Sequence, residues 1–444
     1  MVSLPASSTA MTLSEALIRA YDTNPALEGE RARLRATDEG VPQASSKWRP
    51  TVSVSGSYGM KRSNSTSNGP SNKSADVTQP ATGSLTITQD IYRGGRTFAA
   101  RKKAEHDVQA DRARLSVTEQ NVLLNTATGY ADVVRDQAVL DLNRNNEVVL
   151  WRQLEATQDR FRVGDITLTD VSRAESRLSR AQAERIAAKG RLSVSRASLE
   201  NMVGTAPGKL QPGNPLAGLP ATLENAIQQA KKTNFTVVRA DFLERAARTN
   251  VRTISGELLP TVSVNGSFSA NDETTKDRSQ SESVSVTAKV SIPLYSSGSV
   301  RSRIRAAKEV VSQRRDEFSQ AIRDAVEATT AAWQTLQTSR AQIHAFGQAI
   351  KAAEIALEGL QEEAKVGSRT VLDVLDAEQE LLDARVGLVG SKRDELLATF
   401  QLRHALGDLT VQKLGLPVKI YNVETHYRDV RNKWWGLDSG RKGN

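Results

Sequence analysis

Four short segments of the sequence alternate between apolar and polar residues. The clearest runs from Ser283 to Ile292, where every second residue is apolar and the residues between are Ser, Thr or Lys. A period of two predicts a β-strand with one apolar and one polar face. Similar patterns predict strands at about 51–60, 83–92, 261–270 and 283–292. Each segment has about 9 to 11 residues, the length that a tilted strand needs to cross a bilayer.

Two much longer stretches, Thr97 to Arg162 and Val300 to Lys365, contain no proline. At 1.5 Å per residue each predicts a helix about 100 Å long. The second stretch carries a heptad seam, formed by Leu336, Ile343, Ile350 and Leu357 with Phe346, Ala353 and Leu360. Shorter helices are predicted at Thr12 to Lys47 and Thr169 to Met202, which stacked end to end would match the long helix. We expect a helical tube built from several protomers.

The order of these elements occurs twice. Pro50 to Tyr58 recurs 210 positions later as Pro260 to Phe268. Further along the chain, Val163-Gly164 recurs only 203 positions later, as Val366-Gly367. The first copy therefore has seven extra residues between 58 and 92. Lys61 to Thr82, rich in Ser, Asn, Thr, Gly and Pro, is expected there as an exposed loop.

This duplication divides the chain into five parts. They are an N-terminal segment (1–11), a first repeat of helix, two strands, long helix, tip turn and helix (12–204), a linker (205–221), a second repeat (222–407) and a C-terminal tail (408–444). Met1 to Ala10 lacks a basic region followed by an apolar stretch. We therefore expect that any export signal was removed or lies outside this sequence.

Four strands separated by long helices cannot close a β-barrel within one chain. A soluble two-sided sheet would also give the alternation, but open strand edges cannot face lipid. Several chains together could close a barrel. The expected fold class is therefore mainly α with a transmembrane β part.

Composition excludes several other functions. The chain has no cysteine, four histidines and 5% aromatic residues. No nucleophile with its base, metal cluster or phosphate loop is recognisable, so we expect no enzyme activity, cofactor or metal. No apolar run is long enough for a membrane helix. The net charge of +9 comes from Lys and Arg interspersed with nearly as many Asp and Glu, which indicates solvated helix faces and no nucleic-acid partner.

Two turn motifs, Phe161 to Val171 and Val366 to Ala377, together with Pro293-Leu294-Tyr295 and Gly298, make the chain resemble the TolC-like outer-membrane factor family. The resemblance covers about residues 12 to 410. It implies a homotrimer in which each chain gives four strands to a twelve-stranded β-barrel, continued by an α-helical barrel across the periplasm. The implied function is an outer-membrane exit duct for drugs or secreted proteins in a Gram-negative efflux pump or type I secretion system.

The same resemblance implies the partners. The tip turns would dock the hairpin of a periplasmic adaptor, and an inner-membrane pump of the RND or ABC type would supply the energy. Outer-membrane lipid would surround the barrel. The docking positions are Val163, Gly164, Thr167, Val366, Gly367 and Ser368. Both glycines are also expected to supply turn geometry that other residues adopt only with strain.

Four residues match positions that close the periplasmic entrance in the family: Asp170, Arg369, Asp373 and Asp376. Threefold symmetry would multiply Asp373 and Asp376 into a ring of six carboxylates that favours cations. The alternative is helix N-capping, since acidic residues in a first turn complement the helix dipole. Ala364 stands where some members have a gate tyrosine, so the latch is expected to be looser or to use other contacts.

Two alternatives remain open from the residues. Trp434-Trp435 in the basic tail could anchor the chain at a membrane interface or pack on the helices. A soluble or peripheral coiled-coil scaffold would explain the long helices without a membrane, but it leaves the apolar strand faces unexplained.

Overall fold

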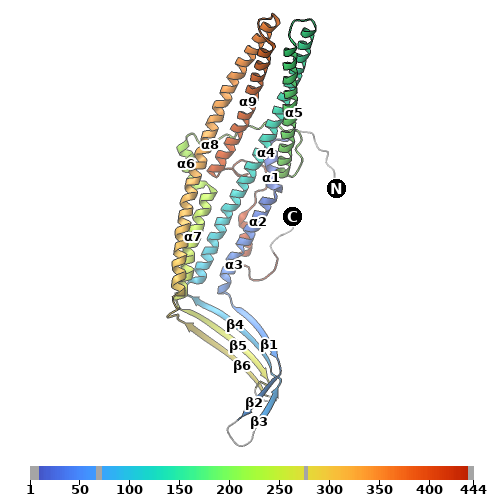
Figure 1. The fold of residues 1–444 in the computed structure, drawn as a ribbon. Coiled ribbons are helices and arrows are strands. Elements are labelled where there is room, and N and C mark those ends of the chain that lie inside the picture. Colours follow the sequence, from blue (N-terminus) through green and yellow to red (C-terminus); the bar gives the residue numbers. More distant parts are fainter. Residues whose placement is uncertain (1–9, 67–72, 275–278, 439–444) are drawn as a thin grey trace. The chain divides into compact units, whose positions relative to one another are not determined.

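The computed structural model describes residues 10–66, 73–274 and 279–438. Nearly all of the predicted N-terminal segment lies outside these residues. Helices and strands follow one another in the same order in both halves of the chain, except that the first half has one more short helix and two more short strands (Figure 1). The chain forms two compact units. The first contains the chain up to Ala32, Ala113–Val238 and Ser319–Tyr421; the second contains Arg33–Arg112, Arg239–Phe318 and the chain from Asn422 onward.

The helices of the two repeats correspond, except at one place. The first repeat contains α1 (Leu13–Thr23), α2 (Pro25–Asp38), α3 (Gly40–Ser45), α4 (Arg96–Arg162) and α5 (Leu168–Val203), and the second contains α6 (Leu223–Thr233), α7 (Phe235–Ser255), α8 (Ser299–Lys365) and α9 (Val371–Leu406). Here α2 and α3 of the first repeat are in the place of α7 in the second. The long helices α4 and α8 have 67 residues each, and α5 and α9 have 36 each. Among the described residues, none of these helices is apolar enough over a sufficient length to cross a membrane.

The predicted single helix from Thr12 to Lys47 is wrong, because the chain leaves the helical conformation at Asn24 (φ −69°, ψ 121°). Pro25 then starts α2, a position that suits a residue without a backbone N–H. The second repeat breaks at the equivalent Asn234 (φ −61°, ψ 123°), although no proline follows. In both repeats the Asn side chain accepts a hydrogen bond from the backbone N–H two residues later. The break therefore belongs to the duplicated Thr-Asn pair and not to the proline.

The C-terminal end of each repeat contacts the helix break of the same repeat. The Thr233 hydroxyl donates to the carbonyl of Leu406 at 2.6 Å, at the end of α9. Gly407 follows with φ 76°, and a Cβ there would lie 2.2 Å from the Thr233 carbonyl oxygen. Only glycine permits so close a backbone approach at a positive φ. Thr23 and Gly204 form the looser counterpart in the first repeat, where the nearest atom to an added Cβ is 3.6 Å away.

The linker between the repeats is fixed by a buried tyrosine of α4. Tyr130 is fully buried, and its hydroxyl lies 2.8 Å from the carbonyl of Met11 and 2.6 Å from that of Gln211. Burial raises the pKa of this phenol to about 12. Met11 also forms a parallel bridge with Leu210. These contacts tie the start of the first repeat to the linker that precedes the second.

The second unit contains an antiparallel sheet of four strands in the order β1 (Thr51–Tyr58), β4 (Ala81–Arg93), β5 (Thr261–Asp272) and β6 (Gln280–Ser291) (Figure 1). Each repeat thus contributes two strands. Pairing of β4 with β5 joins the two repeats within one sheet. The outer strands β1 and β6 are exposed along their whole length.

The register gives the sheet one apolar and one hydroxyl face. Val54 pairs with Leu85, which pairs with Phe268, which pairs with Val284. On the other face, neighbouring strands are linked by hydroxyl pairs at 2.7–2.8 Å: Ser55 with Ser84, Ser57 with Thr82, Ser267 with Ser285, and Ser269 with Ser283. A bulge between Asp90 and Tyr92, which the alternation did not predict, shifts the register of β4 against β5.

The predicted exposed loop from Lys61 to Thr82 is also wrong. Lys61–Thr66 (β2) and Lys73–Thr78 (β3) pair as an antiparallel two-stranded ladder, and Ala81 already begins β4. The extra residues of the first repeat therefore fall between β1 and β4, in the region that contains the paired strands β2 and β3. Ser, Thr and Asn mark turns, but a short ladder also tolerates them where the backbone groups pair with each other, so composition alone missed these strands.

Candidate functional site: the two helix-turn-helix tips

The first tip joins α4 to α5. Gly164 has φ 80°, and its N–H donates to the carbonyl of Phe161 at 2.9 Å, which turns the chain out of α4. Asp165 then makes two hydrogen bonds with Arg160. Its backbone N–H donates to the Arg160 carbonyl at 3.0 Å, and its carboxylate accepts from the Arg160 guanidinium at 2.6 Å. These contacts are local, so the tip is a self-contained turn.

The second tip, between α8 and α9, repeats this geometry with different side chains. Gly367 has φ 77°. Ser368 donates to the carbonyl of Glu363 through its N–H at 3.0 Å and its hydroxyl at 2.9 Å. The Arg369 guanidinium donates to the Glu363 carboxylate at 2.8 Å, a contact that raises the pKa of Arg369. The predicted gate cation is therefore paired within its own tip.

Asp170 and Asp373 occupy equivalent positions and close the starts of α5 and α9. The Asp170 carboxylate accepts from the N–H and hydroxyl of Thr167 at 3.1 and 2.7 Å, and Asp373 accepts from those of Thr370 at 2.9 and 2.8 Å. Each threonine hydroxyl accepts in turn from the N–H of its aspartate, which completes a capping box. For Asp170 the Thr167 hydroxyl is the main cause of a lowered pKa; for Asp373 it is the backbone N–H of Thr370.

The N-capping alternative therefore describes the local geometry of Asp170 and Asp373. Capping uses one carboxylate oxygen of each, Oδ2. Both caps lie in exposed turns. Capping is thus compatible with an additional role at an entrance, which stays a prediction.

Asp376, one turn further along α9, has a different partner. Its carboxylate lies 2.5 Å from the Arg177 guanidinium of α5. Beneath this pair, Val371 and Leu375 of α9 pack against Leu178 of α5 and Leu150 of α4. The ion pair and this apolar cluster hold the first turns of α9 against α5, so the two tips are connected through the helices that follow them.

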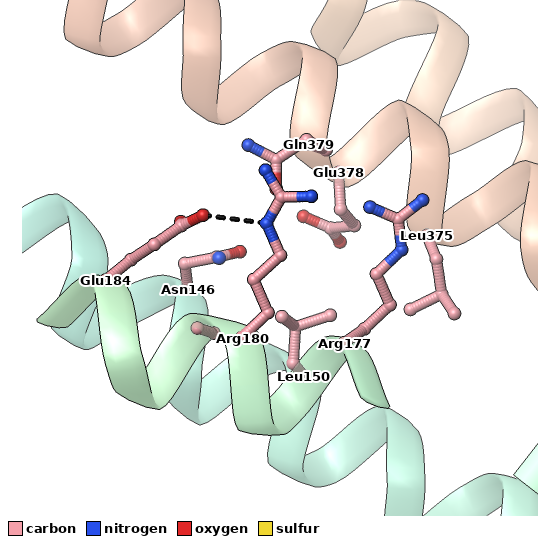
Figure 2. Close-up of a pocket in the computed structure, with 9 residues that line it drawn as sticks. Asn146, Leu150, Arg177, Arg180, Glu184, Leu375, Glu378 and Gln379 are labelled. Atoms are coloured by element: carbon pink, nitrogen blue, oxygen red, sulfur yellow. Dashed lines mark hydrogen bonds and ion pairs between the residues drawn. The ribbon is translucent and has the colours of Figure 1, made fainter. Parts of the chain in front are cut away.

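A small polar pocket lies next to this contact, between α4, α5 and α9 (Figure 2). In Figure 2 the carboxylate of Glu378 lies between the guanidinium groups of Arg177 and Arg180. Burial raises the pKa of Glu378. Arg180 is also bonded to Glu184 at 2.9 Å. The pocket has space only of the order of a single water molecule, so it is no substrate site.

The predicted docking positions lie at the surface of the tips. Val163 and Val366 are 80% and 81% exposed, although both are apolar. Thr167 and Ser368 are also exposed but bonded to their own turns. Ala364, in contrast, is buried with Leu357 and Val374 in the contact of α8 with α9.

Sequence reasoning missed Glu363, the partner of Arg369, and Arg177, the partner of Asp376. Arg177 lies 199 residues before its partner Asp376, so no local spacing could have indicated the pair. Glu363 lies six residues before Arg369, across the turn, and the Val-Gly turn itself could have indicated a contact between them. The described residues contain no group of three or more His, Asp or Glu side chains placed to hold a metal ion.

Comparison with known proteins identifies the class of the molecule. The sequence profile of the outer membrane efflux protein family matches residues 16–205 and 226–408, which include both repeats and both tips. The chain belongs to this family. It is 34% identical over 428 residues to the outer membrane efflux protein BepC of Brucella suis, covering 96% of this chain and 92% of BepC.

More distant members agree with this identification. The outer membrane protein TolC of Vibrio cholerae is 27% identical over 91% of this chain and 92% of its own, and the proteases secretion protein PrtF of Dickeya chrysanthemi is 25% identical over 74% and 73%. The crystal structure of the outer membrane protein VceC from Vibrio cholerae superposes with a TM-score of 0.76 at 20% identity, covering 89% of this chain and 96% of VceC, which shows the same fold.

The predicted fold class and function are therefore confirmed. The chain is an outer-membrane efflux or secretion channel protein with a periplasmic extension, and the coiled-coil scaffold is excluded as the alternative. Its relatives are channel and transport proteins.

Proposed function

We propose that three copies of this chain close their four-stranded sheets into one twelve-stranded barrel that passes cargo through the outer membrane. The observation that carries this proposal is the pair of sheet edges. Among the described residues, β1 and β6 each have one side without a strand partner. Their apolar residues are exposed, with Val54 at 79% and Val284 and Val286 at 77%. Pairing β6 of one copy with β1 of the next removes every open edge.

In such a barrel the two faces of the sheet have separate roles. The apolar face, with Val54, Phe268 and Val284, contacts lipid. The hydroxyl face, with pairs such as Ser55 and Ser84, lines a water-filled pore. Hydroxyls predominate on this face, which also carries Lys289 of β6, and they provide hydrogen bonds for varied cargo.

The tips receive cargo from the periplasmic side. The exposed Val163 and Val366, each beside a positive-φ glycine, provide an apolar contact for the hairpin of a periplasmic adaptor, and an inner-membrane pump supplies the energy. Asp170, Asp373 and Asp376 from three chains surround the entrance, and Arg369 and Arg177 hold the tips in the closed position. Since exposed ion pairs are individually weak, a partner can open them.

Extraction and electrophoresis test this proposal. The protein should require detergent to leave the membrane fraction, run as a trimer on unheated gels and as a monomer after heating, and pass ions when added to a planar bilayer. A chain recovered in the aqueous fraction, monomeric and without conductance, would overturn it.

A further inference from the structure

The C-terminal tail is bound to the second unit by a set of specific contacts. Its helix α10 (Val423–Val430) lies beside α2 (Figure 1). His426 Nδ1 lies 3.0 Å from Oδ2 of Asp38, a carboxylate whose side chain is only 1% exposed. On the same helix, Glu424 pairs with Arg112, whose guanidinium carbon lies 5.2 Å from the centre of the Tyr427 ring. These contacts determine the position of α10.

After α10 the chain reaches the entry of the sheet. Arg49 Nη1 donates to the carbonyl of Lys433 at 2.7 Å, and its guanidinium carbon lies 4.7 Å from the centre of the Trp434 ring. Arg49 stands two residues before β1. These two contacts place Trp434 at the end of the sheet where β1 begins.

The turn that carries Arg49 is on the apolar side of the sheet. Gln89 pairs with Val264 and so shares the face of the apolar residues. Its side-chain amide donates to the carbonyl of Trp48 at 3.0 Å, which fixes the turn above that face. Trp48 is itself 44% exposed. A tryptophan of the turn and one of the tail therefore lie at the same end of the sheet.

The tail tryptophans are not packed on the helices. Trp434 is 61% exposed, Trp435 is 87% exposed, and Leu437 is fully exposed. Within one chain, therefore, the pair is not packed on the helices. Exposed tryptophans are costly in water, but at a membrane boundary the ring contacts acyl chains while the indole N–H reaches the headgroups.

Lys47, Arg49 and Arg431 flank the tryptophans along the chain, and cations at this depth pair with lipid phosphates. We infer that Trp48, Trp434 and Trp435 form an interfacial anchor that binds the phospholipid headgroup boundary of the leaflet facing the periplasm. The inference rests on the proposed function, because only a membrane-spanning sheet places its entry at that boundary. The tail thus acts as a second attachment to lipid beside the barrel.

Fluorescence quenching in proteoliposomes tests the anchor. The full chain, which has five tryptophans, is reconstituted into phospholipid vesicles, with and without phospholipids brominated near the top of their acyl chains. We expect brominated lipid to quench part of the emission, and the variant with W434F and W435F to lose the larger part of this quenching, since Trp48 remains. W151F is the matched control, because Trp151 is 54% exposed but belongs to α4 and not to the sheet or the tail. This variant should leave the quenched intensity unchanged.

The outcomes separate the anchor from the channel. Vesicles that pass ions while the double variant keeps the full quenching of the parent protein would overturn the anchor and leave the proposed function intact. Vesicles that neither retain the parent protein nor pass ions would overturn both.

Discussion

The guanidinium of Arg177 lies 2.5 Å from the carboxylate of Asp376, and this contact joins the last helix of the first repeat to the last helix of the second. Both side chains are partly exposed, at 28% and 56%. The contact therefore adds little to stability but fixes how α9 lies against α5. Such a contact suits a latch, because it can be exchanged for contacts with a partner at small energetic cost.

Asp376→Asn should loosen this latch. We expect the free energy of unfolding to change by less than about 1 kcal/mol, since an exposed ion pair contributes no more. Single-channel conductance in planar bilayers should rise. Glu362→Gln is the control, because Glu362 pairs with Lys365 on the same helix and links no second element. Equal conductance in both variants would argue against a latch at Asp376.

Arg369→Glu should open the second tip. The substituted carboxylate would stand beside Glu363, which now accepts from Arg369 at 2.8 Å, and the like charges would repel. Neutralising Asp373 with Asp373→Asn should also raise conductance by removing the charge of the capping box. If neither variant conducts more than the parent channel, the gate assignment is removed.

The capping boxes should make the tips sensitive to acid. The pKa of Asp373 is held below its usual value, so its carboxylate stabilises the start of α9 fully above the unfolded pKa of about 3.9. This contribution is lost as the pH falls through the lower, folded pKa. Hydrogen exchange of the peptide 366–376, followed from about pH 7 to about pH 3 and corrected for intrinsic rates, should show protection falling only at the acid end. Asp373→Asn should remove the pH dependence, and unchanged acid sensitivity in that variant would assign the effect to another group.

The duplication supplies a matched pair for the glycines that end the repeats. Gly407→Ala and Gly204→Ala both place a Cβ at positive φ, which costs about 1–2 kcal/mol. Only at Gly407 would the Cβ also meet a backbone carbonyl, that of Thr233 at 2.2 Å. The apparent unfolding temperature of the detergent-solubilised protein should therefore fall further for Gly407→Ala. Equal shifts would mean that the backbone approach at Thr233 relaxes without cost.

Local patterns predicted most elements of the fold because the elements are long or strictly periodic. The helix from Thr97 to Arg162 has no residue that would stop it, and the strands around Val54 and Val286 alternate without error. The breaks were harder to predict. Asn24 interrupts a continuous helical pattern through its side-chain bond to the backbone, and the paired strands β2 and β3 have the composition of a loop.

The candidate site was predictable only in part for a related reason. Asp170 and Asp373 stand three residues after a threonine, a spacing that indicates a capping box from sequence alone. The pairing of Asp376 with Arg177 depends on how α5 and α9 pack, which no local pattern contains. Side-chain contacts between different helices therefore became known only from the structure. The turns around Gly164 and Gly367 could be predicted from the sequence.

Disulfide trapping tests the central claim, that β6 of one copy pairs with β1 of another. The chain has no native cysteine, so pairs can be introduced without background. Ser55→Cys in β1 is combined in turn with Ser281→Cys, Ser283→Cys or Ser285→Cys in β6. Ser55→Cys with Ser84→Cys is the control, since these side chains are neighbours within one chain, with hydroxyls 2.8 Å apart.

At least one β1–β6 combination should give covalent trimers after mild oxidation in the membrane, and the control should give only cross-linked monomers. Absence of trimers from every combination, with a chain that is monomeric in mild detergent, would contradict the account.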